Sequence, residues 1–99
     1  MTDREVFETA LKMWGADAQT VMVFEEMSEL QKELCKHARG KENVEQIAEE
    51  IADVQIMLEQ MIVLHNCGEA VKEYRRSKVE RLKIRLGIKY GREEGSETD

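Results

Sequence analysis

The chain has 99 residues, of which 36% are charged, 41% hydrophobic and 5% aromatic, and it contains no proline. This length allows one domain with a thin core. The net charge of −6 makes general nucleic-acid binding a poor fit, because such binding depends on basic groups that neutralise phosphates, so we expect no nucleic-acid polymer as a partner. High charge, few aromatic residues and no proline favour helices over a β-sandwich.

The start of the chain is polar, and no apolar run approaches the roughly 18 residues that a membrane-spanning helix needs. The two cysteines, Cys35 and Cys67, are far apart and form no CxxC pattern. We therefore expect a cytoplasmic protein with reduced thiols and no membrane partner.

Caps and glycines predict two helices in the first part of the chain. Thr2 and Glu5 have the spacing of a capping box that opens a helix ending at Gly15. Asp17 is the predicted N-cap of a long second helix, which runs to about residue 38 and has Gly40 as its stop.

Two further helices are predicted in the second part. Asn43 and Gln46 are expected to cap a helix that continues to about residue 65, and a fourth helix is expected over residues 69–86, ending at Gly87. The sequence thus predicts an all-α domain over residues 1–88, followed by a flexible acidic tail over residues 89–99.

The second and third predicted helices each carry one apolar stripe, which we expect to form the core of a helical bundle. The stripe residues are Val23, Met27, Leu30 and Leu34 in the second helix, and Ile47, Ile51, Val54, Leu58, Met61 and Ile62 in the third. These amphipathic helices need more partner surface than four helices supply, which favours a homo-oligomer.

Charge is unevenly distributed along the chain. Residues 1–68 carry six basic and fourteen acidic side chains, residues 69–92 carry nine basic and three acidic ones, and residues 93–99 carry four acidic ones and no basic one. Any function assigned to the chain has to account for an acidic body followed by a basic helix.

The acidic body contains a short internal similarity, EEMSELQKEL at residues 25–34 and EEIADVQIML at residues 49–58. At about 100° per residue, two acids of each segment lie on the same flank of their apolar stripe. Because only a few residues join the two helices, they should pack antiparallel, and equivalent flanks then share one face. The acids predicted to converge are Glu26, Glu29, Glu50 and Asp53.

Four carboxylates gathered in this way repel one another unless they are protonated or bridged by a cation. An all-oxygen ligand set suits a hard divalent ion, so the pattern favours an Mg²⁺ or Mn²⁺ site with a phosphorylated substrate as its partner. The alternative is a solvated acidic face, which the matching of the two segments makes less favourable. Neither His37 nor His65 has the Glu-x-x-His spacing of a di-iron bundle, and the chain has no P-loop or HExxH motif.

The spacing Glu25-Glu26-x-x-Glu29, twenty residues, then Glu50-x-x-Asp53 resembles the EExxE…ExxD signature of MazG-type nucleotide pyrophosphohydrolases. The resemblance extends over most of the chain. It includes Trp14-Gly15 followed by Gln19, Leu30-Gln31-Lys32, Leu58-Glu59-Gln60, and Lys78-Val79-Glu80-Arg81-Leu82 in a Lys/Arg-rich closing helix. It implies a four-helix MazG-like bundle, completed as a homodimer or homotetramer, that hydrolyses nucleoside triphosphates to the monophosphate and diphosphate.

The resemblance also implies roles for individual residues. Metal ligation is expected from Glu26, Glu29, Glu50 and Asp53, which would hold Mg²⁺, or Mn²⁺, against the triphosphate. One carboxylate or a metal-bound hydroxide would activate water for attack at the α-phosphorus. Glu25 completes the motif, either outside the metal's own ligands or as the base acting on solvent.

Substrate binding is expected from four other residues, namely Gln19, Lys32, Lys78 and Arg81. Two alternative functions stay open. One is phosphoribosyl-ATP pyrophosphohydrolase, which shares the superfamily and the reaction type. The other is a non-catalytic helical interaction module.

Overall fold

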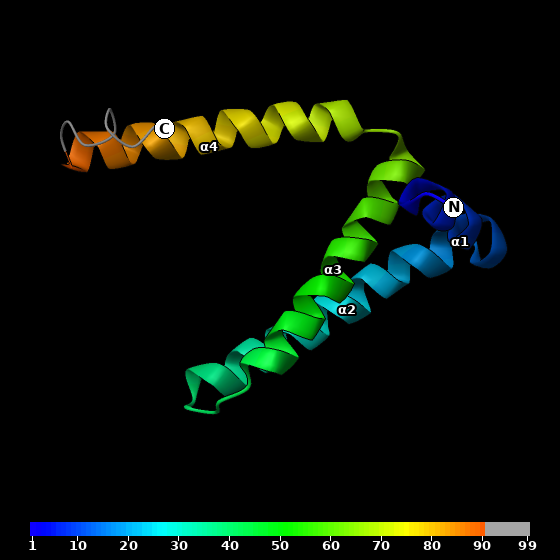
Figure 1. Cartoon of the computed structure of the whole chain (residues 1–99), viewed down its shortest axis with the longest axis horizontal. Coiled ribbons are helices and arrows are strands. Elements are labelled where there is room, and N and C mark those ends of the chain that lie inside the picture. The colour runs from blue at the N-terminus through cyan, green and yellow to red at the C-terminus, as the bar shows by residue number, and fades with distance from the viewer. Residues whose placement is uncertain (91–99) are drawn as a thin grey trace. The chain divides into compact units, whose positions relative to one another are not determined.

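The computed structural model describes residues 1–90, and these contain four α-helices and no strand. The helices α1 (Asp3–Trp14), α2 (Ala16–Ala38), α3 (Val44–His65) and α4 (Gly68–Tyr90) follow one another along the chain (Figure 1). The all-α prediction is therefore confirmed. The chain divides into two compact units, Met1–Asn66 and a second that begins at Cys67. None of these four helices is long and apolar enough to cross a membrane.

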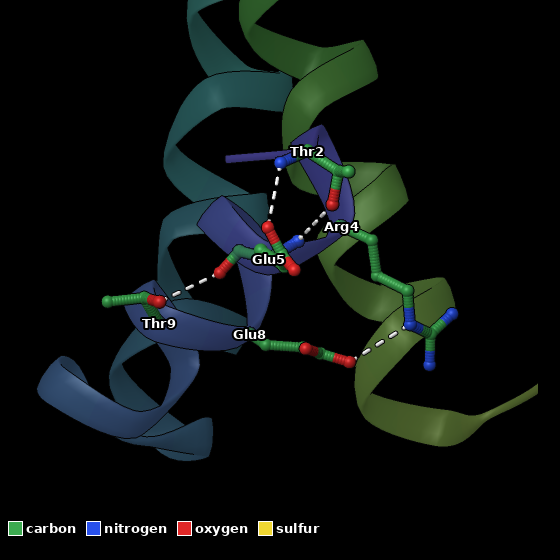
Figure 2. Close-up of polar contacts among 5 residues, drawn as sticks. All are labelled: Thr2, Arg4, Glu5, Glu8 and Thr9. Carbon is green, nitrogen blue, oxygen red and sulfur yellow. Dashed lines mark hydrogen bonds and ion pairs between the residues drawn. The ribbon is translucent and has the colours of Figure 1, made fainter.

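The start of α1 is the predicted capping box. The Thr2 Oγ1 atom accepts a hydrogen bond from the Glu5 backbone N–H at 3.1 Å, and Glu5 Oε1 accepts one from the Thr2 backbone N–H at 2.9 Å (Figure 2). Arg4 Nε and Glu8 Oε2 form an ion pair of 2.9 Å one turn apart, and the Thr9 hydroxyl donates to the Glu5 carbonyl at 2.7 Å. Local contacts thus satisfy backbone donors that a helix start leaves without partners.

A single glycine separates α1 from α2. Gly15 has a φ of 92°, a region that favours glycine, and its N–H donates to the Leu11 carbonyl at 2.9 Å. Its own carbonyl accepts from the Gln19 N–H at 3.1 Å, so α2 begins directly after it. The prediction that Asp17 caps α2 is wrong, because Gly15 occupies the cap position and Asp17 lies in the first turn. There its charge still interacts favourably with the helix dipole.

The end of α2 confirms Gly40 as its stop. Gly40 has a φ of 102°, its N–H donates to the His37 carbonyl at 2.9 Å, and the Lys41 N–H donates to the Lys36 carbonyl at 3.1 Å. These two bonds have the pattern of a Schellman motif, in which a left-handed residue lets the chain leave the helix.

Asn43 precedes α3 as predicted, but its side chain makes no cap hydrogen bond. The residue is only 2% exposed, and its Nδ2 donates to the Glu33 carbonyl at 3.0 Å and to Glu33 Oε1 at 2.8 Å. Lys36 Nζ pairs with the other carboxylate oxygen of Glu33 at 3.2 Å. The prediction that the Asn43 side chain caps α3 together with Gln46 is therefore wrong. The Asn43 amide instead binds Glu33 and so connects the start of α3 to the last turns of α2.

The helices α2 and α3 lie side by side and antiparallel, and α1 packs against both of them (Figure 1). Thr20 Oγ1 lies 3.8 Å from Met61 Sδ at the end of this hairpin opposite to Asn43. The buried apolar side chains are Val23, Val54 and Met57.

The predicted core stripes are only partly buried. Val23 and Val54 are buried, and Leu30, Ile47, Met61 and Ile62 are half-buried. The other four members are exposed, namely Met27, Leu34, Ile51 and Leu58. These four therefore lie outside the core that the first unit forms by itself, and their burial in a homo-oligomer stays a prediction.

The helix α4 starts within one residue of its prediction but does not end at Gly87, and it continues to Tyr90. A glycine inside a helix costs about 1 kcal/mol relative to alanine, yet it ends the helix only where the chain turns away. Along α4, Lys72–Glu69, Arg76–Glu73 and Lys83–Glu80 pair at i,i+3 spacing. Most of the predicted acidic tail, residues 91–99, lies outside the described residues.

Candidate metal centre

Three carboxylates from two helices meet on one side of the α2–α3 hairpin. Glu26 of α2 and Glu50 and Asp53 of α3 each place one carboxylate oxygen within 4.8 Å of the others. All three residues are half-buried. Within residues 1–90, no other group of three or more His, Cys, Asp or Glu side chains comes this close together.

Helix periodicity and antiparallel packing bring these groups together. Glu50 and Asp53 are three residues apart, so both side chains project from neighbouring turns of the same side of α3. Glu26 lies level with them, because the links between Asn43 and Glu33 and between Thr20 and Met61 fix the register of the hairpin. The acidic flanks of the two helices therefore converge, as the sequence pattern predicts.

Crowding of like charges perturbs two of the three groups. Partial burial raises the pKa of Glu26, and the negative charges of Asp53, Glu29 and Glu25 raise it further. Partial burial also raises the pKa of Glu50, followed by the charges of Asp53, Glu26 and Glu29. The cluster thus favours either a shared proton or a positive ion.

The donor set fits a hard divalent cation. All the converging ligand atoms are carboxylate oxygens, which Mg²⁺ and Mn²⁺ prefer. Glu50 Oε1 is buried and has no hydrogen-bond partner among residues 1–90, although a buried carboxylate oxygen is costly to leave unpaired. A bound cation would satisfy this oxygen and relieve the repulsion, so Glu26, Glu50 and Asp53 are the residues that would hold it.

The two other acids of the motif are exposed. Glu29 lies one turn after Glu26 and is not among the three that meet within 4.8 Å. Its negative charge nevertheless contributes to the raised pKa values of both Glu26 and Glu50. Glu25 is exposed beside the cluster and acts electrostatically on Glu26.

The residues predicted to bind substrate belong to both compact units. Gln19 is buried within the first unit, and Lys32 is exposed on α2. Lys78 and Arg81 are exposed on α4, which belongs to the second unit. The role of these four residues in substrate binding stays a prediction.

One buried polar residue in the segments that resemble the MazG-type family has no predicted role. Gln60 of α3 is as buried as Gln19, and its Oε1 has no hydrogen-bond partner among residues 1–90. It follows Asp53 by seven residues, two helical turns, and so lies on the acidic side of α3. The seven-residue spacing from Asp53 would have been enough to predict that Gln60 lies on the same side of α3 as the acids.

Comparison with models of protein families, with curated proteins and with solved structures gave no match for this chain. The chemistry of the acidic cluster therefore has to be inferred from its own residues. Membership of the MazG-type family remains a prediction from the motif.

Proposed function

We propose that this chain is an Mg²⁺-dependent nucleoside triphosphate pyrophosphohydrolase, which converts a (d)NTP and water to a (d)NMP and diphosphate. The observation that carries the proposal is the meeting of Glu26, Glu50 and Asp53 within 4.8 Å, with one buried oxygen left unpartnered. The resemblance of the motif to MazG-type enzymes adds the reaction. We further propose a cytoplasmic enzyme of nucleotide-pool housekeeping, assembled as a homodimer or homotetramer.

Each acid has a distinct part in this proposal. Glu26, Glu50 and Asp53 would bind the ion, and Glu29 would extend the ligand set from the next turn of α2. When bound, Mg²⁺ would supply charge neutralisation for the triphosphate. Glu25 is exposed to solvent, so one of its carboxylate oxygens can accept the proton of an attacking water.

The cations of the chain would contribute by charge alone. Lys32 lies three residues after Glu29 on α2, and Lys78 and Arg81 lie in a helix with an excess of positive charge. Each can pair with phosphate oxygens that the metal leaves free. Gln19 would donate a hydrogen bond from its side-chain amide to the substrate.

The direct test is a panel of canonical and modified NTPs and dNTPs, assayed for diphosphate release with and without Mg²⁺. We expect release that requires the metal. The variants Glu29→Gln and Asp53→Asn should lose turnover and metal binding while retaining their helical circular dichroism. Glu59→Gln, an exposed acid on α3 away from the cluster, serves as the matched control and should keep full activity.

Other outcomes would replace this proposal. Absence of turnover on every nucleotide in a well-folded sample would refute it. Turnover of phosphoribosyl-ATP alone would identify phosphoribosyl-ATP pyrophosphohydrolase instead. A biological activity that survives both Glu29→Gln and Asp53→Asn would favour the non-catalytic interaction module.

A further inference from the structure

Two buried glutamines lie at the same level of the α2–α3 hairpin. Gln19 of α2 and Gln60 of α3 are each only 6% exposed, and both belong to the first unit. Their chain neighbours Thr20 and Met61 are in contact, with 3.8 Å between Thr20 Oγ1 and Met61 Sδ, and this contact sets the two glutamines level with each other. We call the two glutamine side chains the amide pair.

The amide pair continues the acidic side of the hairpin. Gln19 precedes Glu26 by seven residues, and Gln60 follows Asp53 by seven residues. Each glutamine therefore lies two turns, or about 10.5 Å, along the same side of its helix from an acid of the cluster. Because the two helices are antiparallel, both glutamines lie toward the same end of the hairpin.

A methionine lies between the glutamine and the acid on each helix. Met57 of α3 is buried, and Met22 of α2 is half-buried. The order glutamine, methionine, acid along α2 recurs in reverse along α3, with the same spacings of three and four residues. The level pairs are Gln19 with Gln60, Met22 with Met57, and Glu26 with Asp53. This side of the hairpin thus presents carboxylates, then thioethers, then amides.

The amide pair is costly as a purely structural feature. Gln60 Oε1 is buried and has no hydrogen-bond partner among residues 1–90. Leaving a buried acceptor unpaired loses free energy, whereas a methionine or leucine would fill the same space without that loss. A ligand that donates a hydrogen bond to Gln60 Oε1 would remove the cost.

We infer that the amide pair binds the base edge of a nucleotide whose phosphates are held at the acidic cluster. Gln60 Oε1 accepts a hydrogen bond from a ring N–H or an amino group of the base, and the methionine layer packs against the ribose and the base. The two turns between Asp53 and Gln60 leave room for the nucleoside. This inference rests on the proposed function, since it takes the acids to hold the phosphates through a metal ion.

The chemistry of the amide pair selects the base over the other parts of a nucleotide. An ionised phosphate offers only acceptors, so it cannot donate to Gln60 Oε1. The ribose directly follows the phosphates and lies level with the methionines. The edge of a base presents donors and acceptors side by side, and a primary amide does the same.

The base enters between α1 and the hairpin. The helix α1 packs against both α2 and α3, at the end of the hairpin where α2 begins and α3 ends (Figure 1). No residue of α1 is buried, and Gly15 alone joins α1 to α2. Moving α1 aside therefore exposes no fully buried side chain of α1 itself, and it opens the amide pair to a ligand.

The test is isothermal titration calorimetry in Mg²⁺ with inorganic tripolyphosphate and with the α,β-methylene analogues of ATP, GTP, CTP and UTP. We expect at least one analogue to bind wild type about tenfold or more tightly than tripolyphosphate does, because only the analogues carry a base. Gln60→Met keeps the length of the side chain without its amide. It should weaken the binding of that analogue about tenfold or more and leave tripolyphosphate binding unchanged.

Two further variants make the test specific. Gln55→Met is the matched control, because Gln55 is exposed on α3 about 140° around the helix from Gln60, and it should change neither affinity. Gln19→Met should weaken the binding of the same analogue but not that of tripolyphosphate. Gln60→Met should unfold in EDTA at a Tm no lower than that of wild type, because it removes the unpaired acceptor.

Three results would overturn the inference. They are equal affinity of wild type for tripolyphosphate and all four analogues, unchanged analogue binding in both Gln60→Met and Gln19→Met, and loss of tripolyphosphate binding as large as the loss of analogue binding. The proposed function is judged separately by diphosphate release. Turnover of a nucleotide without any effect of Gln60→Met refutes only the inference, whereas binding that depends on Gln60 without turnover refutes only the proposed function.

Discussion

Replacing Glu26 with glutamine should stabilise the metal-free protein and at the same time abolish its response to Mg²⁺. Glutamine has the same shape, and its amide can donate to the Asp53 carboxylate, which a charged Glu26 cannot do. The substitution removes one of three carboxylates that meet within 4.8 Å, and with it the cost of keeping a half-buried charge among like charges.

The expected gain follows from the separation of the charges. Two like charges 4.8 Å apart repel by about 0.9 kcal/mol in water, and by more where protein excludes part of the water. Partial burial and the neighbouring negative charges raise the pKa of Glu26, in the direction expected for such repulsion. We therefore expect a gain of about 1 kcal/mol in the free energy of unfolding. For a chain of this size, that corresponds to about 4–8 °C in Tm.

The assay is thermal unfolding of wild type and Glu26→Gln, in EDTA and in millimolar Mg²⁺, at one protein concentration. Wild type should unfold at a lower temperature than Glu26→Gln in EDTA, and only wild type should gain stability from Mg²⁺. The matched control Glu59→Gln should stay within about 0.5 kcal/mol of wild type in EDTA and keep its response to Mg²⁺. A lower Tm for Glu26→Gln in EDTA, or an equal Mg²⁺ response in both proteins, would refute the reasoning.

Two further predictions concern pH and the turn between α2 and α3. Because the pKa values of Glu26 and Glu50 are raised, the native state binds protons more tightly than the unfolded chain does. The contribution of these two groups to the free energy of unfolding in EDTA therefore falls as pH rises from about 4.5 through the raised pKa values. The stability gain of Glu26→Gln over wild type should therefore grow with pH in urea titrations between pH 4 and 8, and a constant gain would contradict this. Asn43→Ala should cost about 1–3 kcal/mol in urea unfolding, because it removes two hydrogen bonds to Glu33 from a buried site. The control is Gln46→Ala, and an equal cost for both variants would show that Asn43 does not fasten the hairpin.

Local signals in the sequence were sufficient to predict the four helices. Thr2 with Glu5, Gly15 and Gly40 act through contacts within a few residues, so their patterns carry the same meaning in any tertiary context. The prediction that α4 ends at Gly87 failed because a glycine permits a left-handed conformation but does not require it, and the chain continues as a helix through this residue. The prediction that Asp17 caps α2 failed because Gly15 occupies the cap position and the helix begins at the next residue.

The convergence of the acids could be predicted because the pattern occurs twice. A single Glu-rich helix defines a direction but no partner, whereas two matched helices joined by a short turn define both. The sequence could not rank Glu29 below the other three, since the distance between carboxylates depends on helix separation and rotamers. Nor could it show that Asn43 binds Glu33, because that contact joins residues ten apart across a turn.

The internal similarity that brings the acids together also makes the stability of the first unit depend on what neutralises them. In the first unit, only Val23, Val54 and Met57 are buried apolar residues, whereas three acids that repel one another lie within 4.8 Å. So small a core leaves little free energy to offset that repulsion. A cation bound among these acids would therefore stabilise the native state by mass action, and the smaller the core, the larger the share of the stability that depends on it.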